Sequence, residues 1–435
     1  MRRLWGKPAH LDVVAEELRK RHGDDRVHIL CAKSNNGNYT YDGIELGGER
    51  LAHEIEETLD TLEKDGQKVR KLSIVGYSLG GLVSRYAIGL LHAQGWLVKV
   101  EPVNFTTFAT PHVGVRTPLT GMRGYVWNEL GAKTISTSGQ QLFMVDEFRD
   151  TGRPLLGVLA DPQSIFIQGL KRFPNRSAYA NIVNDRAVVF YTSAISKVDP
   201  FQDLENININ YVKGYDDVII DRDEYLVPSP PDDQQNMASR VWKRLKALGI
   251  QVPIGLLVLL LAPLASSIFL LNALVQTIRS RRRIRSHGKG KNGLRFGRYQ
   301  VPLLMQDAQH VVEEVYEHVN ARQNPSYLSN TDSSDSATEE TKVKAEEPSD
   351  SLKEDDSVPP KARSKDSARK FPKLALSPTQ FAIIDSLNEL GLHKYPVHIQ
   401  RHGHSHAAII VRKPQDKFWE GRVVLKHWLD NEFVL

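Results

Sequence analysis

Apolar and polar residues follow alternating helical and strand periods along the first part of the chain. Helices show apolar residues three and four positions apart, whereas the strands are short β-branched runs bounded by charged and turn residues. The predicted elements are a helix from Leu11 to Gly23, a strand over 27–32, a helix over about 48–62, a strand over 69–75 and, after the glycine-rich stretch 76–81, a helix through Leu90. This alternation predicts an α/β fold with a mostly parallel sheet.

The same pattern continues to residue 183 and returns near the C-terminus. Further strands are expected over 99–108 and 178–183, and the mostly helical stretch between them, about 114–171, is a candidate lid over a site. Globular composition resumes at 375–435, with a helix near Pro378 to Leu390 and a strand at 396–399.

Two segments between these parts have a different composition. Residues 254–275 contain no charge over twenty-two positions, and seven basic residues follow: Arg279, Arg281, Arg282, Arg283, Arg285, Lys289 and Lys291. As a helix the apolar segment is about 33 Å long, enough for a bilayer core of about 30 Å. Residues 324–370 are rich in Ser, Asp, Glu, Lys and Pro, which predicts a disordered insertion.

Composition and charge exclude several classes of protein for this chain. The 435 residues are 40% hydrophobic and 25% charged, as in ordinary globular proteins. The net charge of +5 is too small to indicate a nucleic-acid partner. One cysteine, Cys31, allows no intramolecular disulfide, and residues 1–10 lack the apolar run of a signal peptide. We therefore expect a reducing compartment.

The stretch Gly76-Tyr77-Ser78-Leu79-Gly80 is a G-x-S-x-G motif placed between a predicted strand and a predicted helix. That is the context of a nucleophile elbow, in which glycines let strand and helix approach while the serine hydroxyl projects above the sheet. The alternative is an accidental glycine-rich turn. The flanking elements favour Ser78 as a nucleophile.

A serine nucleophile needs a histidine base and a carboxylate that orients it, in the chain order serine, acid, histidine. Asp185 directly follows the predicted strand 178–183 and is the preferred acid, with Asp199 and Asp217 as competitors.

Three alternating histidines, His402, His404 and His406, are candidates for the base. His406 adjoins an apolar run and is preferred, with His404 next, because a base must be held rigidly. A zinc site is the rival chemistry, but no nearby Cys or carboxylate completes a ligand set. We expect no cofactor and no metal.

This triad restricts the membrane topology. A single crossing at 254–275 would separate Asp185 from His406 by a bilayer, so we predict a membrane-associated hairpin that turns near Pro263. The alternatives are a helix buried in the protein core and, for the basic cluster, a nuclear signal. A hairpin also fits the monolayer of a lipid droplet. We expect membrane association on the cytosolic face, at lipid droplets or the endoplasmic reticulum, with a glycerolipid or phospholipid as substrate.

Seven stretches together resemble the putative serine esterase family of fungi and other eukaryotes, which includes lipid-droplet phospholipases and monoacylglycerol lipases of yeast. They are Leu4-Trp5-Gly6-Lys7-Pro8-Ala9-His10, Tyr41-Asp42-Gly43-Ile44, Gly48-Glu49-Arg50, Gly76-Tyr77-Ser78-Leu79-Gly80-Gly81, Phe108-Ala109-Thr110-Pro111-His112, Asn184-Asp185-Arg186 and His406-Ala407-Ala408-Ile409-Ile410. The resemblance implies an α/β-hydrolase fold, Ser78 as nucleophile, Asp185 as acid, His406 as base, and hydrolysis of glycerolipid acyl esters.

The start of the chain departs from the family pattern. The family has an apolar strand ending in His-Gly where this chain has Arg2 and Arg3 after Met1. We expect Leu79 and Leu4 to supply the two oxyanion N–H donors, with the first strand of the sheet missing and Leu4 on a frayed terminus. A coding sequence that begins upstream of Met1 is our preferred explanation, and an impaired enzyme is the other.

The expected organisation combines these segments. It comprises a hydrolase core at 1–250 with the lid at about 114–171, a hydrophobic hairpin and polybasic segment at 251–292, a helical return at 293–323, a disordered insertion at 324–370 and a C-terminal part of the core at 371–435. We predict a lipase or phospholipase. The alternatives are a catalytically impaired lipid-binding or scaffold protein, and acyl transfer to an acceptor other than water.

Overall fold

The computed structural model describes residues 8–116, 118, 128, 136–227, 275, 278–280, 282–286 and 371–435. Leu4, the helical return and the predicted disordered insertion lie outside these residues, as does most of the predicted hairpin. No helix within the described ranges has the length and hydrophobicity needed to cross a bilayer.

Strands and helices alternate over most of the described chain. The strands are β1 (Lys71–Tyr77), β2 (Glu101–Phe108), β3 (Asn175–Asn181), β4 (Asn208–Ile209), β5 (Leu226–Val227) and β6 (His393–Val397). The α-helices are α1 (Asp12–His22), α2 (Ile44–Lys64), α3 (Leu79–Ala93), α4 (Trp96–Lys99), α6 (Thr137–Phe143), α7 (Leu155–Leu159), α8 (Ile165–Lys171), α9 (Phe190–Ser193), α12 (Pro378–Asn388), α13 (Ser405–Ala408) and α14 (Trp419–Asn431). The short 3₁₀ helices are Pro8–Leu11, Gly37–Tyr41, Leu204–Asn206 and Asp416–Phe418.

The main sheet has four parallel strands in the order β1-β2-β3-β6. The connections between its strands contain helices, as parallel strands require. β4 and β5 form a separate two-stranded antiparallel sheet. The predicted α/β class with a mostly parallel sheet is confirmed.

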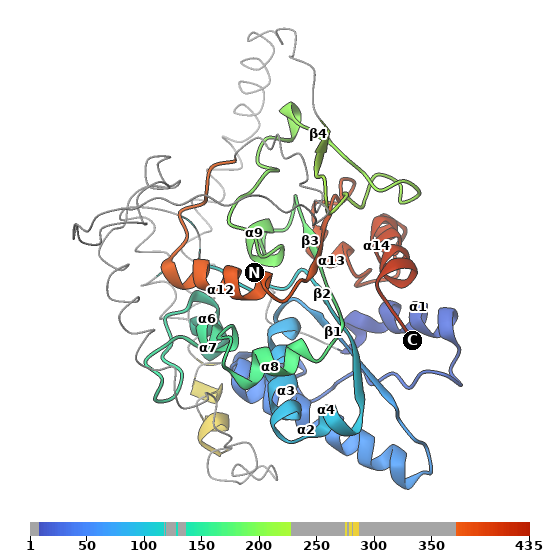
Figure 1. Ribbon diagram of the computed structural model, residues 1–435, viewed down its shortest axis with the longest axis vertical. Coiled ribbons are helices and arrows are strands. Elements are labelled where there is room, and N and C mark those ends of the chain that lie inside the picture. Colours follow the sequence, from blue (N-terminus) through green and yellow to red (C-terminus); the bar gives the residue numbers. More distant parts are fainter. Residues whose placement is uncertain are drawn as a thin grey trace, which may run out of the picture.

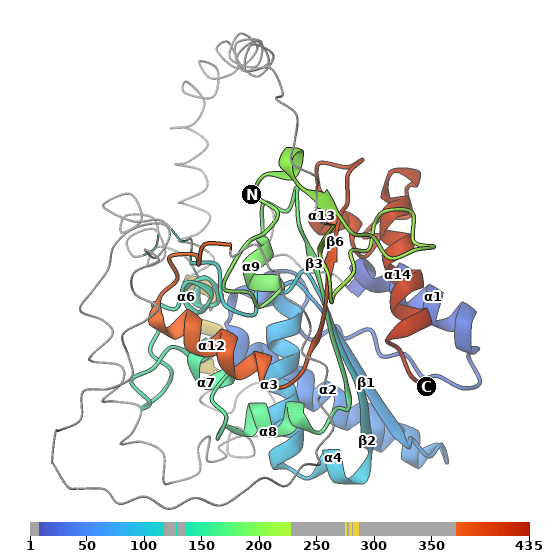
Figure 2. The same cartoon turned by 45° about the horizontal axis from the view of Figure 1, so that its top comes forward.

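Helices cover both faces of the main sheet, which lies between them in Figures 1 and 2. Side chains alternate along a strand, so Phe105 of β2 lies in the core beneath α2, α3, α8 and α12, whereas Phe108 lies in the opposite core beneath α1 and α14. Both rings are fully buried. The sheet is therefore a rigid middle layer whose carboxyl ends can hold a site.

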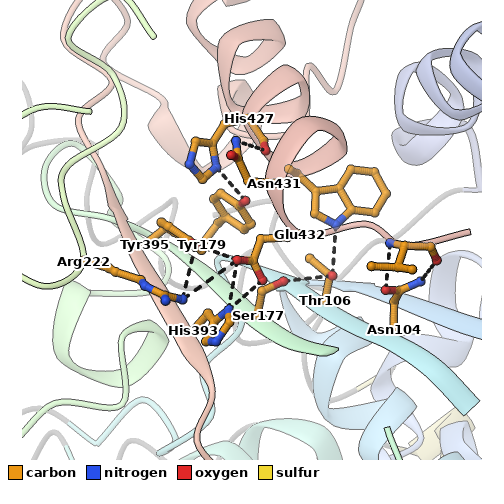
Figure 3. A network of polar contacts seen from close by, with 12 residues as sticks. Asn104, Thr106, Ser177, Tyr179, Arg222, His393, Tyr395, His427, Asn431 and Glu432 are labelled. Atoms are coloured by element: carbon orange, nitrogen blue, oxygen red, sulfur yellow. Dashed lines mark hydrogen bonds and ion pairs between the residues drawn. The ribbon is translucent and has the colours of Figure 1, made fainter. Parts of the chain in front are cut away.

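The last helix, α14, is fixed to the sheet by polar contacts as well as by packing (Figure 3). Buried Glu432 accepts a hydrogen bond from Tyr395 Oη at 2.5 Å and lies 2.9 Å from His393 Nδ1. Trp428, which is fully buried, donates its Nε1 proton to Thr106 Oγ1 at 3.0 Å. These pairs satisfy buried polar groups that would otherwise destabilise the fold.

The predicted strand at 27–32 is wrong, because this segment pairs with no described strand. It lines a cavity of about 1020 Å³, and the outer strand β1 lines the same cavity. The next two N–H groups, of Lys33 and Ser34, bond the Glu54 carboxylate of α2 at 2.8 and 3.0 Å. A ladder requires a neighbouring strand, and none of the described strands lies beside this run.

The described part of the candidate lid belongs to the core. Its helix α8 packs against α3, where Gly89 allows close approach, since a Cβ there would lie 2.3 Å from the Phe166 ring. Leu155 and Leu156 of α7 are fully buried, and Phe166 is 1% exposed. The helices of residues 136–171 therefore pack into the same core as α2, α3 and α12, on one face of the sheet.

Candidate active site

Ser78 lies at the sharp turn between β1 and α3. Its backbone has φ 53° and ψ −132°, a conformation that residues other than glycine rarely adopt. A Cβ on Gly76 would lie 2.5 Å from the Cα of Gly81, and a Cβ on Gly81 would lie 2.2 Å from Thr110 Oγ1. The turn therefore depends on Gly76 and Gly81. Gly80, which the motif led us to expect at the close approach, faces open space.

Asp185 follows β3, and both of its carboxylate oxygens are engaged. Oδ1 accepts hydrogen bonds from the N–H groups of Ala187 and Val188 at 2.9 and 2.8 Å. Oδ2 accepts one from Asn181 Nδ2 at 2.9 Å and lies 2.8 Å from His406 Nδ1. These contacts fix the orientation of the carboxylate.

The same contacts keep Asp185 ionised. Burial by itself would raise the pKa of Asp185, but the hydrogen bond and charge of His406 lower it. The N–H of Val188 and the amide of Asn181 act in the same direction, so the pKa lies below its ordinary value.

His406 lies on the short helix α13, just after β6. Its Nε2 is 3.0 Å from Ser78 Oγ, and the whole residue is only 8% exposed. Tyr77 Oη donates to the His406 carbonyl at 2.7 Å, and Ser405 Oγ donates to the Val183 carbonyl at 2.7 Å. The imidazole is thus held between Asp185 and Ser78.

This arrangement can move a proton between Ser78 Oγ and His406 Nε2 while Asp185 stabilises the imidazolium. Leu79 is the first residue of α3, so its N–H is one of the groups without an intrahelical acceptor and can serve an oxyanion. The other predicted donor, Leu4, lies outside the described residues. Of the five predicted site residues, the structure brings three together, with His406 in hydrogen-bond contact with both Ser78 and Asp185.

The competing candidates occupy other environments. Asp199 Oδ1 accepts the Phe201 N–H at 3.1 Å within its own turn, and His402 stacks edge-on against Phe418 with ring centroids 4.8 Å apart. His404 precedes α13. Among the described residues no group of three His, Cys, Asp or Glu side chains has the geometry of a metal site.

The cavity beside β1 extends to the serine. Ser78, Leu79 and His406 line it together with apolar side chains from α1, α2 and β1, among them Val14, Leu59, Leu62, Leu72 and Ile74. Five apolar residues of the candidate lid do not line this cavity: Leu142, Phe143, Leu155, Leu156 and Phe166. Four of them, Leu142, Leu155, Leu156 and Phe166, lie instead in the core that α3 and α8 share on one face of the sheet.

Three supporting residues were missed by sequence reasoning: Asn181, Tyr77 and Ser405. Asn181 is the last residue of β3, and its amide reaches the acid four positions later. Nothing in a strand sequence distinguishes such an asparagine. Tyr77 lies inside the serine motif, but its bond to the His406 carbonyl joins residues 329 positions apart.

Comparisons with known proteins agree with the motif. Residues 3–197 match the family described as "Putative serine esterase (DUF676)". "Putative lipase ROG1" of Saccharomyces cerevisiae is 32% identical over 220 residues, covering 46% of this chain and 30% of that protein. "Putative lipase YDL109C" of the same yeast is 34% identical over 204 residues with the same coverage.

A fission-yeast protein extends the comparison. "Putative lipase C4A8.10" of Schizosaccharomyces pombe is 29% identical over 209 residues, 43% of this chain and 26% of that protein. The chain thus matches about a third or less of the length of these relatives. No solved structure gives a significant match.

Proposed function

We propose that the protein hydrolyses acyl esters of lipids through Ser78, Asp185 and His406, because residues 3–197 match the family described as putative serine esterases. The observation that carries the proposal is the pair of contacts through the imidazole, 3.0 Å to Ser78 Oγ and 2.8 Å to Asp185 Oδ2. Residues 78, 185 and 406 are far apart in sequence, and a chance arrangement would not align both imidazole nitrogens.

The proposed reaction has two halves. Ser78 Oγ attacks the acyl carbonyl while His406 Nε2 takes its proton, and the negative carbonyl oxygen is stabilised by the Leu79 N–H. His406 then returns the proton to the leaving alcohol. Water, deprotonated by the same imidazole, attacks the acyl-enzyme and releases the acid. Leu4 is proposed as the second oxyanion donor on the resemblance alone.

The fold supports the same class. The serine follows β1, the acid follows β3 and the base follows β6, and in a parallel sheet these carboxyl ends lie at one edge. The order serine, acid, histidine is that of α/β-hydrolases. We therefore propose an α/β-hydrolase fold for the chain.

The cavity supports a substrate with a long apolar acyl chain, since apolar side chains of α1, α2 and β1 line it up to Ser78. The three relatives described above are each named "Putative lipase". We propose a glycerolipid or phospholipid as substrate. The charge-free segment 254–275 and the basic residues after it motivate a site of action at the cytosolic face of a membrane or at a lipid droplet.

A covalent label and an ester substrate test this function together. The wild-type chain is expected to react with a fluorophosphonate and to hydrolyse a p-nitrophenyl ester, and Ser78→Ala is expected to lose both. Ser196→Ala is a matched control, because the Ser196 hydroxyl donates to the Val198 carbonyl within its own turn. Folded wild-type protein that neither labels nor hydrolyses any ester would refute the proposal and favour a lipid-binding or scaffold role.

A further inference from the structure

The helical residues 278–280 and 282–286 are fixed to the core of the protein by a buried carboxylate. Arg283 Nε lies 3.0 and 2.9 Å from the two carboxylate oxygens of Asp42, which is 2% exposed. Asp42 also accepts from Arg50 Nη2 at 2.8 Å. Ser280 Oγ donates to the Tyr41 carbonyl at 3.3 Å. A planar guanidinium on a buried carboxylate fixes orientation as well as distance, so this segment has a defined position.

That position is at the wall of the cavity that contains the serine. The Arg283 guanidinium lies 5.3 Å from the centre of the Tyr39 ring, and Arg50 lies 4.8 Å from the same ring. Tyr39 and Gly43, on either side of Asp42, line the cavity together with Ser78. Figure 1 shows the segment in yellow on the side of the molecule that carries α7.

The opposite side of the segment is basic and apolar. Arg279, Arg282 and Arg285 are three residues apart, are exposed, and form no ion pair with any residue in the described ranges. Val275 and Ile278, just before them, are 37% and 44% exposed. Ser280 and Arg283 contact the core. The other three described arginines of this helix are exposed on its outer side.

We propose that Arg279, Arg282 and Arg285 bind the headgroups of anionic phospholipids in a bilayer, with Val275 and Ile278 entering its interface. Charge complementarity favours a polyanion, and two exposed aliphatic residues at the end of a charge-free segment favour a membrane over a nucleic acid. The contact holds the wall of the Ser78 cavity close to the lipid. That the bound membrane also contains the substrate rests on the proposed function, whereas the binding of anionic headgroups does not.

The test measures binding of the full chain to sedimented vesicles, in the Ser78→Ala background so that catalysis plays no part. The vesicles are phosphatidylcholine alone or mixed with phosphatidylserine. The triple variant Arg279→Gln, Arg282→Gln, Arg285→Gln is expected to lose about 100-fold of the phosphatidylserine-dependent partitioning, since each basic residue contributes about fivefold. High salt is expected to remove the same increment.

A matched control removes three exposed charges elsewhere, through Lys64→Gln, Lys171→Gln and Lys213→Gln. It should change partitioning by less than about fivefold. Equal losses in both triple variants, or no dependence on phosphatidylserine in the parent, would overturn the inference. RNA binding that depends on the three arginines, without any dependence of vesicle binding on phosphatidylserine, would identify a nucleic acid as the partner instead. Arginine-dependent vesicle binding, together with wild-type protein that is folded but hydrolyses no ester, would refute the proposed function alone and leave this inference standing.

Discussion

Replacing Asp185 with Asn separates the role that we propose for Asp185, orienting the imidazole of His406, from its role in the fold. In the variant D185N, the side-chain carbonyl oxygen can still accept the N–H groups of Ala187 and Val188, which bond Oδ1 in the native protein. The amide nitrogen then replaces Oδ2, where the native carboxylate meets two partners, Asn181 Nδ2 and His406 Nδ1. The new NH₂ group is a hydrogen-bond donor, so it cannot bond the Asn181 amide nitrogen, which is also a donor. It can bond His406 Nδ1 only when that nitrogen carries no proton.

The substitution therefore favours the wrong imidazole tautomer. With its proton on Nε2, His406 cannot accept the proton of Ser78 at that nitrogen. The amide also lacks the negative charge of the Asp185 carboxylate, which would stabilise the imidazolium. An acid-to-amide change of this kind costs about 10⁴-fold in kcat, which corresponds to about 5 kcal/mol of transition-state stabilisation. KM should change little, because Asp185 is buried behind the imidazole.

Steady-state hydrolysis of a p-nitrophenyl ester and the rate of fluorophosphonate labelling measure this loss. Asp199→Asn is the matched control, because Asp199 is also a turn carboxylate that accepts a backbone N–H, here from Phe201. It should keep wild-type activity. If D185N hydrolyses the ester within tenfold of wild type while remaining folded, Asp185 does not orient the base and the reasoning fails.

The packing and the charges lead to three further predictions. Gly76→Ala should destabilise the fold by about 1–3 kcal/mol in urea unfolding, because its Cβ meets the α3 backbone at 2.5 Å, whereas Gly80→Ala, in open space, should not. The lowered pKa of Asp185 contributes stability that is present above its unfolded pKa of about 4 and is lost as the pH falls through the lower folded pKa. The melting temperature of D185N should therefore fall less between pH 6 and pH 3 than that of wild type, and parallel curves would contradict this. Trp428→Phe removes the bond to Thr106 and leaves a cavity, so we expect a loss of about 2 kcal/mol by chemical denaturation, and an unchanged midpoint would refute it.

Local signals predict most of the main sheet. Strands β1, β2, β3 and β6 lie within a few residues of the bounds expected from the sequence, because a short apolar run bounded by polar and turn residues carries its signal in a short window. The boundaries shift where pairing decides them. β1 ends at Tyr77 rather than 75, since its last residues pair with Thr107 and Phe108 of β2.

Features that depend on distant residues were not predictable from the pattern. The run 27–32 has strand composition, but no described strand lies beside it to pair with. Gly81 is required only because Thr110 comes within 2.2 Å of its Cβ position, and the motif itself emphasises Gly80. The pair of Asp42 and Arg283 joins residues 241 positions apart, for which no local periodicity exists.

The pairing of β3 with β6 also joins two parts of the chain that are far apart in sequence. Residues 8–227 contain Ser78 and Asp185, whereas His406 lies in residues 371–435. The second part also supplies α12 to one core and α14 to the other. A protease that cuts between 228 and 370 would therefore leave two fragments with a shared sheet and shared cores, and the two expressed separately are candidates for a split enzyme that reassembles without a peptide bond.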